Sequence, residues 1–353
     1  MFGSHIELGF NVRASIARIR VLARSGIARI IESRTRSAAL ALMLVVFPFA
    51  AQPQQVHRPY RIGVLNEAWA ANHPTVEGLR TGLRELGFEE GRDVVFDIRF
   101  TQGKPEATSA AAEALVKAGV DLIFTSNEAA TQAAKNATKT IPIVFTLVGD
   151  PVITGFVRTV AKPGGNITGV SSLTTELAGK RLEILTILAP KVHRIWAIYY
   201  SEDPSSTAAI VRAEAAAKQL NVMLLARPVH TAEELHQVVK SVHPGDALLP
   251  PDVGTLDVPA ALLELSLSSR IPAVFATSLW VGHGGLVSYG SDYYAEGVQA
   301  ARLVAKILRG ARAGDLPVEG ADKIELAVNL KTASVLGLEV PRKILLRADM
   351  IRR

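Results

Sequence analysis

The chain of 353 residues contains no cysteine. It therefore forms no disulfide, carries no lipid-modified N-terminal cysteine, and has neither thiol catalysis nor a cysteine-ligated metal. A cysteine-free chain is compatible with the periplasm but does not require that compartment.

The sequence also lacks the short motifs of several enzyme classes. The first predicted strand is followed by "NEAWAAN" and not by G-x-G-x-x-G, which argues against a dinucleotide-binding fold. Neither a G-x-x-x-x-G-K-[ST] phosphate loop, a G-x-S-x-G nucleophile elbow nor an H-E-x-x-H zinc motif is present. The eight histidines are scattered without the spacing of metal ligands. These absences predict a protein with no catalytic residue, no metal site and no cofactor.

Excess positive charge is almost absent outside the N-terminal segment. The chain has a net charge of +6, and residues 1–51 alone hold seven arginines against two glutamates. The remainder of the chain therefore has a net charge of only +1. Such a nearly neutral part has no bulk attraction for phosphate backbones, so we expect no nucleic-acid partner.

The apolar run "SAALALMLVVFPFA" covers residues 37–50. It is shorter than the ~20 residues that span a bilayer comfortably. Because it follows an arginine-rich stretch and precedes small residues, it is typical of a secretory signal. We predict that residues 1–51 are a leader segment and that the chain is periplasmic, with an uncleaved membrane anchor as the alternative. The true start codon and the cleavage site stay open, since 36 residues precede the run and "PFAAQPQQ" lacks a clean A-x-A site.

Short apolar runs alternate with helical stretches in two successive series. The first series predicts strands at 61–66, 93–100, 121–126 and 141–148, with helices at 74–88, 105–119 and 127–138. The second predicts strands at 194–200, 221–229, 246–252, 271–277 and 284–290, with helices at 207–220, 231–242, 261–270 and 294–310. This alternation predicts βα units on parallel sheets.

The fold class that follows is α/β, with two doubly wound, Rossmann-like lobes whose parallel sheets are joined by a hinge. We assign residues 59–163 and 291–351 to lobe 1 and residues 167–288 to lobe 2. Crossovers are expected near 161–173 and 284–292. In the first of these, Gly164, Gly165 and Gly169 are predicted to supply the backbone geometry of the hinge.

Polar residues follow many of the predicted strands, at the edge where open α/β sheets bind ligands. They are Asn66, Glu67, Thr125, Ser126, Asn127 and Asp150 in the first series, and Tyr200, Ser205, Ser206, Asp252 and Thr277 in the second. Trp69 lies in the loop after the first strand, where it is either a lid residue or part of a surface patch. The set contains no evident nucleophile–base pair and therefore predicts ligand binding.

Each of these candidates also has a plain structural role. Ser126 and Asn127 are expected to cap the next helix, whose free N–H groups also favour an anionic ligand group. Asp150 before Pro151 is either a cap or a ligand contact. Asp252 is a candidate partner for a ligand amine, because carboxylates accept charge-assisted hydrogen bonds. Tyr200 fits the core as well as the site.

Five segments carry a resemblance to a known family. They are "YRIGVLNEAWAANHPTVEGLRTGLRELGFEEGRDV" (60–94), "IPIVFTLVGDPVITGFV" (141–157), "KPGGNITGVSSL" (162–173), "GGLVSYGSDYYAEGVQAARLVAKILRGARAGDLPVE" (284–319) and "LAVNLKTASVLGLEVPRKILLRADMI" (326–351). They resemble the substrate-binding proteins of ABC transporters, in the family that includes tryptophan- and phenylalanine-binding members. The resemblance covers about residues 59–351. It implies a type I periplasmic-binding fold, in which two lobes close over a ligand.

The resemblance also implies partners and part of the site. The family's strand-end Ser/Thr falls on Thr125 and Ser126, and its Asp-Pro on Asp150. The loop "YYSEDPSS" (199–206) departs from the family's Asn- and Ser-rich loop by two carboxylates, which either bind a ligand amine or are solvated. The implied function is that of an extracytoplasmic monomer that delivers a small amino-acid-like or carboxylate-bearing solute to the membrane subunits of an ABC permease. The solute itself stays open.

Two alternatives remain at this stage. A ligand-responsive regulator or sensor would use the same two-lobe fold, with residues 1–55 as a DNA-binding head, although the apolar run at 37–50 does not suit a helix-turn-helix unit. A two-lobe enzyme is the other alternative, and the missing catalytic motifs count against it. Localisation separates the regulator from the binding protein, and turnover of a bound solute would identify an enzyme.

Overall fold

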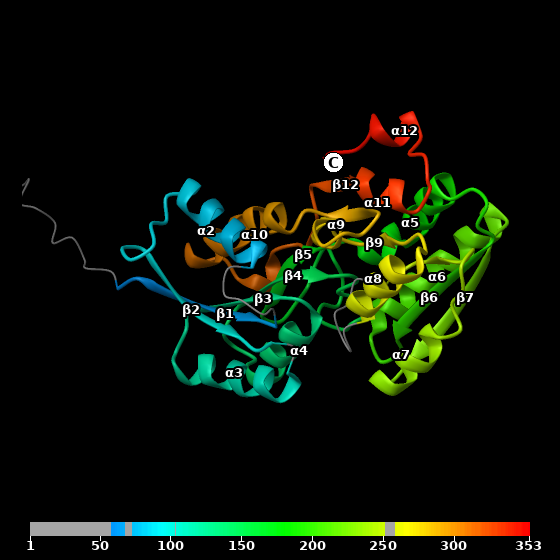
Figure 1. The fold of residues 1–353 in the computed structure, drawn as a ribbon. Coiled ribbons are helices and arrows are strands. Elements are labelled where there is room, and N and C mark those ends of the chain that lie inside the picture. Colours follow the sequence, from blue (N-terminus) through cyan, green and yellow to red (C-terminus); the bar gives the residue numbers. More distant parts are fainter. Residues whose placement is uncertain (1–57, 68–72, 103, 251–257) are drawn as a thin grey trace, which may run out of the picture. The chain divides into compact units, whose positions relative to one another are not determined.

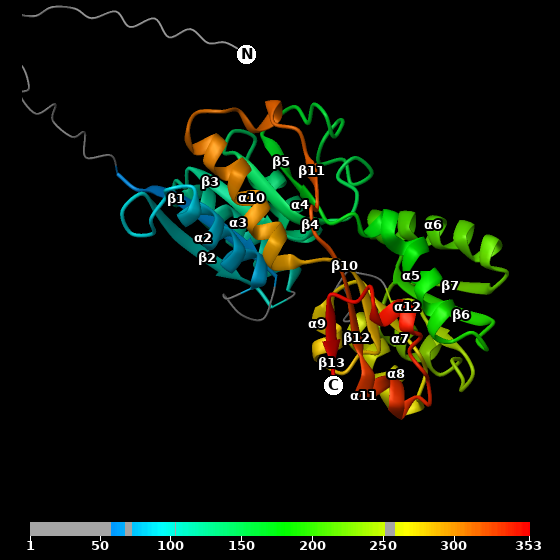
Figure 2. The same ribbon diagram turned by 90° about the horizontal axis from the view of Figure 1, so that it is seen from above.

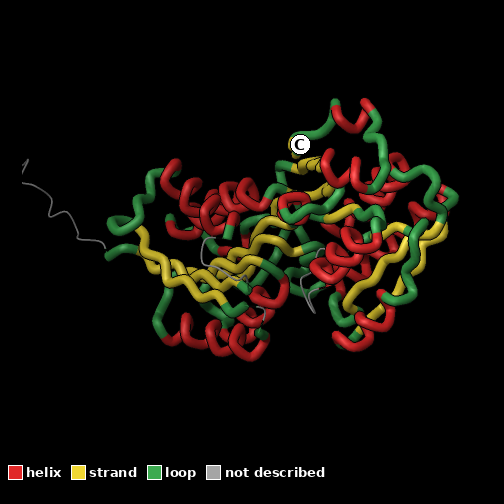
Figure 3. Tube along the Cα trace, in the orientation of Figure 1, coloured by secondary structure: helices red, strands yellow, loops and turns green. Residues whose placement is uncertain are grey.

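The computed structural model describes residues 58–67, 73–102, 104–250 and 258–353 (Figure 1). The predicted leader therefore lies outside the described residues. Arg58–Arg353 form one unit by their contacts, and its strands fall into two groups, here called lobe 1 and lobe 2. The predicted α/β fold class with two lobes is confirmed by this arrangement (Figure 3).

Lobe 1 is built on a six-stranded sheet with the strand order β11-β5-β4-β3-β1-β2. The strands are β1 (Tyr60–Asn66), β2 (Val94–Phe100), β3 (Leu122–Ser126), β4 (Ile143–Val148), β5 (Ile167–Ser171) and β11 (Glu319–Gly320). All neighbouring pairs run parallel. β1, β3, β4 and β5 are buried almost throughout, as expected for parallel strands covered on both faces.

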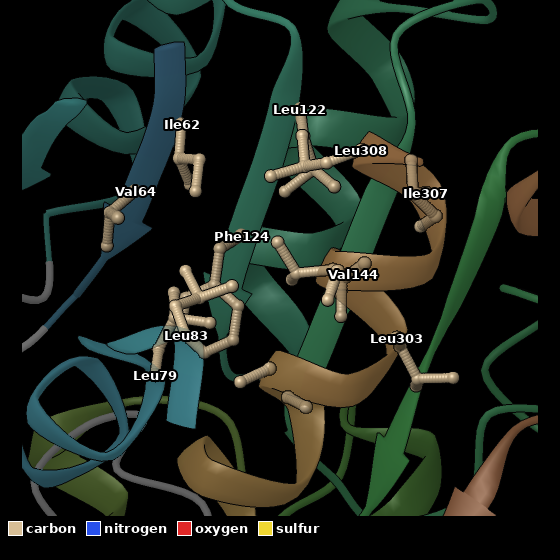
Figure 4. Close-up of a cluster of buried hydrophobic side chains, with 14 of the residues drawn as sticks. Ile62, Val64, Leu79, Leu83, Leu122, Phe124, Val144, Leu303, Ile307 and Leu308 are labelled. Carbon is tan, nitrogen blue, oxygen red and sulfur yellow. The ribbon is translucent and has the colours of Figure 1, made fainter. Parts of the chain in front are cut away.

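Helices cover both faces of this sheet. They are α2 (Pro74–Glu85), α3 (Pro105–Lys117), α4 (Glu128–Ala137) and α10 (Tyr293–Leu308), and the turn η2 (Ala313–Asp315) follows α10. α2 and α10 pack against each other on one face, whereas α3 and α4 cover the other (Figures 1 and 2). The core under α2 and α10 includes Leu79, Leu83 and Leu303, which meet Phe124 and Val144 of the strands (Figure 4).

Lobe 2 has strands in the order β7-β6-β8 and β13-β12-β10-β9. They are β6 (Arg194–Tyr200), β7 (Met223–Val229), β8 (Ala247–Leu248), β9 (Val274–Phe275), β10 (Val287–Ser291), β12 (Ile324–Asn329) and β13 (Met350–Arg352). An isolated parallel bridge between Leu248 and Ala273 links the two groups. The strands are parallel except that β12 runs antiparallel to β10, which the parallel-sheet prediction did not include.

The helices of lobe 2 again lie on two sides of the strands. They are α5 (Thr174–Leu188), α6 (Pro204–Leu220), α7 (Ala232–Val239), α8 (Val258–Ser269), α9 (Ser278–Gly282), α11 (Leu330–Val335) and α12 (Arg342–Leu345). α5 and α6 pack on one core with β6, β10 and β12, while α7 and α8 pack on another with β6, β8 and β9. In the described part of the chain, none of the helices combines the length and apolarity needed to cross a bilayer.

Three chain segments cross between the lobes. The first joins β5 to α5, the second joins β10 to α10, and the third joins β11 to β12. Hydrogen bonds hold them together: Ala321 N donates to Ser171 O (2.8 Å) and Asp292 N donates to Lys323 O (3.1 Å). The Lys323 ammonium also pairs with the Asp292 carboxylate at 2.6 Å. The third crossing was not anticipated from the sequence.

The strand pairing differs from the expected lobe boundaries at two places. β5 pairs with β4 in lobe 1, although residues from 167 onward were assigned to lobe 2. β12 and β13 extend from β10 in lobe 2, although 291–351 was assigned to lobe 1, so that assignment is wrong for its second half. The reason is physical: an apolar run shows that a segment is a buried strand, but its sheet is chosen by long-range pairing.

Candidate functional site

The carboxyl ends of three parallel strands in lobe 1 bring the predicted polar residues to one edge. β1 ends at Asn66, β3 at Ser126 and β4 at Val148, and these strands are hydrogen-bonded neighbours in the sheet. In the β1–β3 register, Asn66 lies directly opposite Ser126. Ligands of open α/β sheets bind at this edge, so these strand ends form one wall of the candidate site.

The start of α4 is the most elaborate part of this wall, and we call residues 126–128 the α4 corner. The Asn127 Oδ1 accepts a hydrogen bond from Ala130 N (2.8 Å), so the predicted capping role is confirmed for this residue. Asn127 has φ 134°, a conformation that non-glycine residues seldom adopt. Its Nδ2 donates to Glu67 Oε2 (2.9 Å), while Glu67 Oε1 accepts from Thr108 Oγ1 (2.9 Å).

Ser126 is tied to the start of α2 by hydroxyl groups. Its Oγ lies 2.9 Å from Thr75 Oγ1, and Thr75 Oγ1 lies 2.8 Å from His73 Nδ1. Burial lowers the pKa of His73 to about 4, so the ring is neutral near pH 7. Thr125 points to the other side of the sheet, where its Oγ1 lies 2.8 Å from Thr131 Oγ1. Thr125 is fully buried there.

Lobe 2 contributes a second corner at the start of α6, and we call residues 203–206 the α6 corner. Asp203 caps the helix, because its Oδ2 accepts from Ser206 N (2.6 Å). Ser205 and Ser206, both predicted as site residues, are 1% and 5% exposed. The carboxylate of Asp203, one of the two that depart from the family pattern, is therefore a buried helix cap and not a solvated charge.

The two corners meet through Glu128, the first residue of α4. Its Oε1 accepts hydrogen bonds from the Ser205 hydroxyl and from Gly149 N, the latter at 3.0 Å. Asp150 N donates to Ser205 Oγ at 3.1 Å, so Ser205 is held from two strand ends of lobe 1. A Cβ atom on Gly149 would lie 2.9 Å from the Ser205 Cβ, which is closer than packing allows. Glycine at this position thus permits the lobes to touch.

Sequence reasoning missed Glu128. Burial raises its pKa to about 9, together with the neighbouring carboxylate of Asp203; the hydrogen bonds from Ser205 and Gly149 oppose the rise. The other oxygen, Oε2, is buried and accepts no hydrogen bond. It is therefore the oxygen placed to carry the proton. A carboxylate directly after a capping Asn was the available signal, but its bonding partner on lobe 2, Ser205, lies 77 residues away along the chain.

A small cavity lies beside the α6 corner inside lobe 2. It has a volume of about 20 Å³ and is lined by Thr174, Ala178, Arg181, Tyr199, Ser206, Ala209, Ile210, Leu249 and Pro250. Arg181 is 2% exposed, and its guanidinium donates to Thr174 O (2.8 Å) and Thr174 Oγ1 (3.1 Å). The volume is enough for a water molecule and not for a solute.

The remaining predicted residues are more dispersed. Tyr200 donates its hydroxyl to Glu202 (2.7 Å) in an exposed pair. Thr277 caps α9 at the end of β9. The Asp150 carboxylate accepts from Val152 N and Ile153 N, which is the turn-capping role considered for it. Trp69 and Asp252 lie outside the described residues.

The three glycines predicted for the hinge lie in lobe 1. Gly164 and Gly165 have φ values of 71° and 65°, and Gly164 N donates to Gly314 O (3.0 Å) in the turn after α10. Gly169 is inside β5, where a Cβ atom would lie 2.3 Å from Phe145 O. Close packing accounts for the glycine at that position, and the hinge role of all three stays a prediction. Within the described ranges, His, Asp and Glu form no cluster that could hold a metal ion.

Comparison with known proteins gives one family and several solved relatives. The family model for ABC transporter substrate binding proteins matches residues 69–352. The chain is 30% identical over 273 residues to a tyrosine-binding protein of Clostridioides difficile, covering 76% of this chain and 79% of the relative.

Two solved structures extend the comparison to three dimensions. An ABC domain of Streptococcus pneumonia in complex with L-Trp is 26% identical, with a TM-score of 0.76, over 83% of this chain and 99% of the other. A ligand-free, open substrate-binding protein with adhesive properties from Clostridium difficile is 28% identical, with a TM-score of 0.62, over 83% and 99%. At nearly equal identity, this chain therefore matches the L-Trp complex better than the open structure.

Proposed function

We propose that this chain, which belongs to the ABC transporter substrate-binding protein family, binds an amino acid with an aromatic side chain and delivers it to the membrane subunits of an ABC permease. The family assignment carries the general part of the proposal. The choice of solute is supported by two relatives, one a tyrosine-binding protein and one crystallised with L-Trp. The protein would act as an extracytoplasmic monomer that releases its solute unchanged.

The two polar corners support a site between the lobes. At the α4 corner, backbone N–H groups at the helix start and the hydroxyl of Ser126 offer donors for a carboxylate. Tyr200 at the end of β6 and Thr277 after β9 are the proposed contacts from lobe 2. Contacts from both lobes would favour the closed arrangement over the open one, which is how a solute shifts the equilibrium of a hinged protein.

Two further residues of the proposed site lie outside the described residues. Asp252 is the proposed partner of the amino group, because a carboxylate forms a charge-assisted hydrogen bond with an ammonium. Trp69 is proposed to stack on the aromatic ring of the solute. These two contacts would distinguish an aromatic amino acid from a simple carboxylic acid.

A thermal-shift screen tests the proposal. The protein from residue 58 onward is heated with L-tyrosine, L-tryptophan, L-phenylalanine and non-aromatic amino acids. A solute at ~100 times its dissociation constant adds ~2.7 kcal/mol to the free energy of unfolding, which gives an upward shift of the melting temperature. Aromatic amino acids are expected to raise it most.

Variants then locate the solute. Ser126→Ala and Asp252→Ala are expected to weaken binding of the best amino acid at least tenfold, whereas the control Ser268→Ala, an exposed residue of α8, leaves it unchanged. Unchanged affinity in both site variants would place the solute elsewhere. N-terminal sequencing of the protein from whole cells tests export, because a mature chain that begins near residue 52 excludes the regulator alternative.

A further inference from the structure

We propose that Glu128 is the positioning residue that joins the α4 corner to the α6 corner, and that it does so only when protonated, so that closing the lobes takes up one proton from solution. The contact itself is a property of the chain. Its effect on solute affinity rests on the proposed function, since it requires a solute that binds between the corners.

The hydrogen bonds around Glu128 require a proton. Ser205 and Gly149 donate to Oε1, which leaves the buried Oε2 facing no donor. The neighbouring group on lobe 2 is the Asp203 carboxylate, whose own Oδ2 accepts from Ser206 N. Two neighbouring buried carboxyl groups do not both ionise without a cation, because their like charges repel and burial penalises each charge. Glu128 is the one that holds the proton, because its Oε2 is buried without a hydrogen-bond partner and no oxygen of Asp203 is in that position.

No positive charge replaces that proton among the described residues. On lobe 1, Lys135 of α4 donates to Gly155 O, and the Asp150 carboxylate accepts a hydrogen bond from Val152 N of its own loop. Glu67 is held by Thr108 and Asn127. On lobe 2, Asp203 is the facing charge, and none of the ion pairs in the described ranges includes Glu128. The raised pKa of about 9 agrees with this geometry.

Opening the lobes would reverse these conditions. Once the α6 corner moves away, Glu128 loses Ser205 and Asp203 and gains water, so its pKa returns toward the ordinary value of 4.5. Between that value and about 9, the closed form holds one proton more than the open form. The equilibrium constant for closing is then largest at acid pH and falls by up to tenfold for each pH unit of increase. Above about 9 the proton is lost from both forms and the dependence ends.

The absence of native cysteine makes the motion directly measurable. Spin labels are placed on Gln132→Cys of α4 and Arg212→Cys of α6, two exposed positions on opposite lobes, and the distance between them is measured in the ligand-free protein at pH 6.0 and pH 8.5. We expect a short-distance population at pH 6.0 that gives way to longer distances at pH 8.5.

Three variants identify the responsible group. Glu128→Gln places an uncharged amide beside Asp203 at every pH and should keep the short distance at both values. Asp203→Asn retains a capping oxygen but removes the facing charge, so its pH dependence should be shallower. Glu214→Gln, an exposed acid of α6, should behave as the parent. Equal distances at both pH values in the parent, or an equal shift in Glu128→Gln, would overturn the proposal.

A binding titration extends the test to the solute. Dissociation constants for L-tyrosine and L-tryptophan are measured from pH 5.5 to 8.0, where their amino groups stay charged. The parent should lose up to tenfold affinity per pH unit, and Glu128→Gln should show a flat profile. Binding with no pH dependence in the parent contradicts the role of Glu128 and leaves the proposed function intact. Absence of binding at every pH contradicts the proposed function. In that case the spin-label distances in the ligand-free protein test the role of Glu128 in closing by themselves.

Discussion

The Glu67 carboxylate in lobe 1 holds the Asn127 side chain in one orientation. Glu67 Oε2 accepts from Asn127 Nδ2 at 2.9 Å, which turns Asn127 Oδ1 toward Ala130 N at the start of α4. The loop after β1 and the corner after β3 are thereby fixed to each other. The α4 corner contributes hydrogen-bond donors to the candidate site. The bond between Glu67 and Asn127 therefore orients part of the site even where Glu67 itself contacts no ligand.

Replacement of Glu67 should loosen the α4 corner. Glu67→Ala removes the acceptor for both Asn127 and Thr108, and we expect a loss of about 1–2 kcal/mol in the free energy of unfolding, since the group is partly exposed. Glu67→Gln keeps one acceptor oxygen and should lose about half as much. Urea denaturation measures both. Equal stability of Glu67→Ala and the parent would show that the contact contributes nothing.

Asn127 combines a capping side chain with a positive φ, and two substitutions separate these contributions. Asn127→Ala loses the cap, worth about 1 kcal/mol, and places an alanine at φ 134°, which costs a further 1–3 kcal/mol. Asn127→Gly loses the cap but adopts this φ without strain, so it should cost only a few tenths of a kcal/mol. Chemical denaturation measures the free energy of unfolding of both variants. Equal values for Asn127→Ala and Asn127→Gly would contradict a cost from the positive φ.

The partly buried His73 predicts a pH dependence of stability on the acid side. Its pKa is about 4 in the folded protein and near 6.5 when unfolded, so below pH 6.5 only the unfolded chain takes up the proton. The contribution of His73 to the free energy of unfolding is greatest above pH 6.5 and falls by up to about 3 kcal/mol as the pH drops to 4. In denaturation series over this range, His73→Asn should remove that fall, whereas the exposed control His236→Asn should retain it.

The contact between α2 and α10 depends on a glycine. A Cβ atom on Gly297 would lie 2.0 Å from Thr75 O, so Gly297→Ala should cost at least 1–3 kcal/mol and displace the hydroxyl that bonds Ser126. Gly179→Ala on α5 is the matched control, because its Cβ would meet Ala216 Cβ at 3.2 Å and Arg212 O at 3.7 Å, both far looser than the contact at Gly297. Its helix propensity gain of up to about 1 kcal/mol should offset this. Melting temperatures compare the two, and a stable Gly297→Ala would show that the helices can separate.

The local elements followed directly from the sequence. β6 was predicted to its residue limits, and most other strands and helices to within a few residues, because buried parallel strands are short apolar runs and the helices between them begin and end at caps and glycines. Asn127 was predicted as a cap from its place between an apolar run and an alanine-rich helix. Four helices, α5, α9, α11 and α12, and four strands, β5, β11, β12 and β13, were not predicted. β5 and α5 were missed because the Gly- and Pro-rich stretch at 161–173 was taken as a crossover.

The candidate site was only partly accessible in this way. Ser126, Asn127, Ser205 and Ser206 were predicted from their positions after strands, since a polar residue after an apolar run is a local signal. Glu128 was not named, because its meaning depends on Ser205 and Asp203, which approach it only after both lobes have formed. In the sequence, Glu128 is one more acidic residue in the first turn of a helix, where acids are common.

By itself, therefore, the sequence determined two series of βα units, the caps and turns between them, and the family resemblance that the family model confirms. These properties depend on neighbours in the chain or on a pattern of apolar residues. Only the tertiary structure decided that β12 and β13 join lobe 2, that three segments cross between the lobes, and that Glu128 is buried beside Asp203 and bonded by Ser205. Each of these depends on which distant groups meet and on the burial that follows, and neither quantity is present in a local pattern.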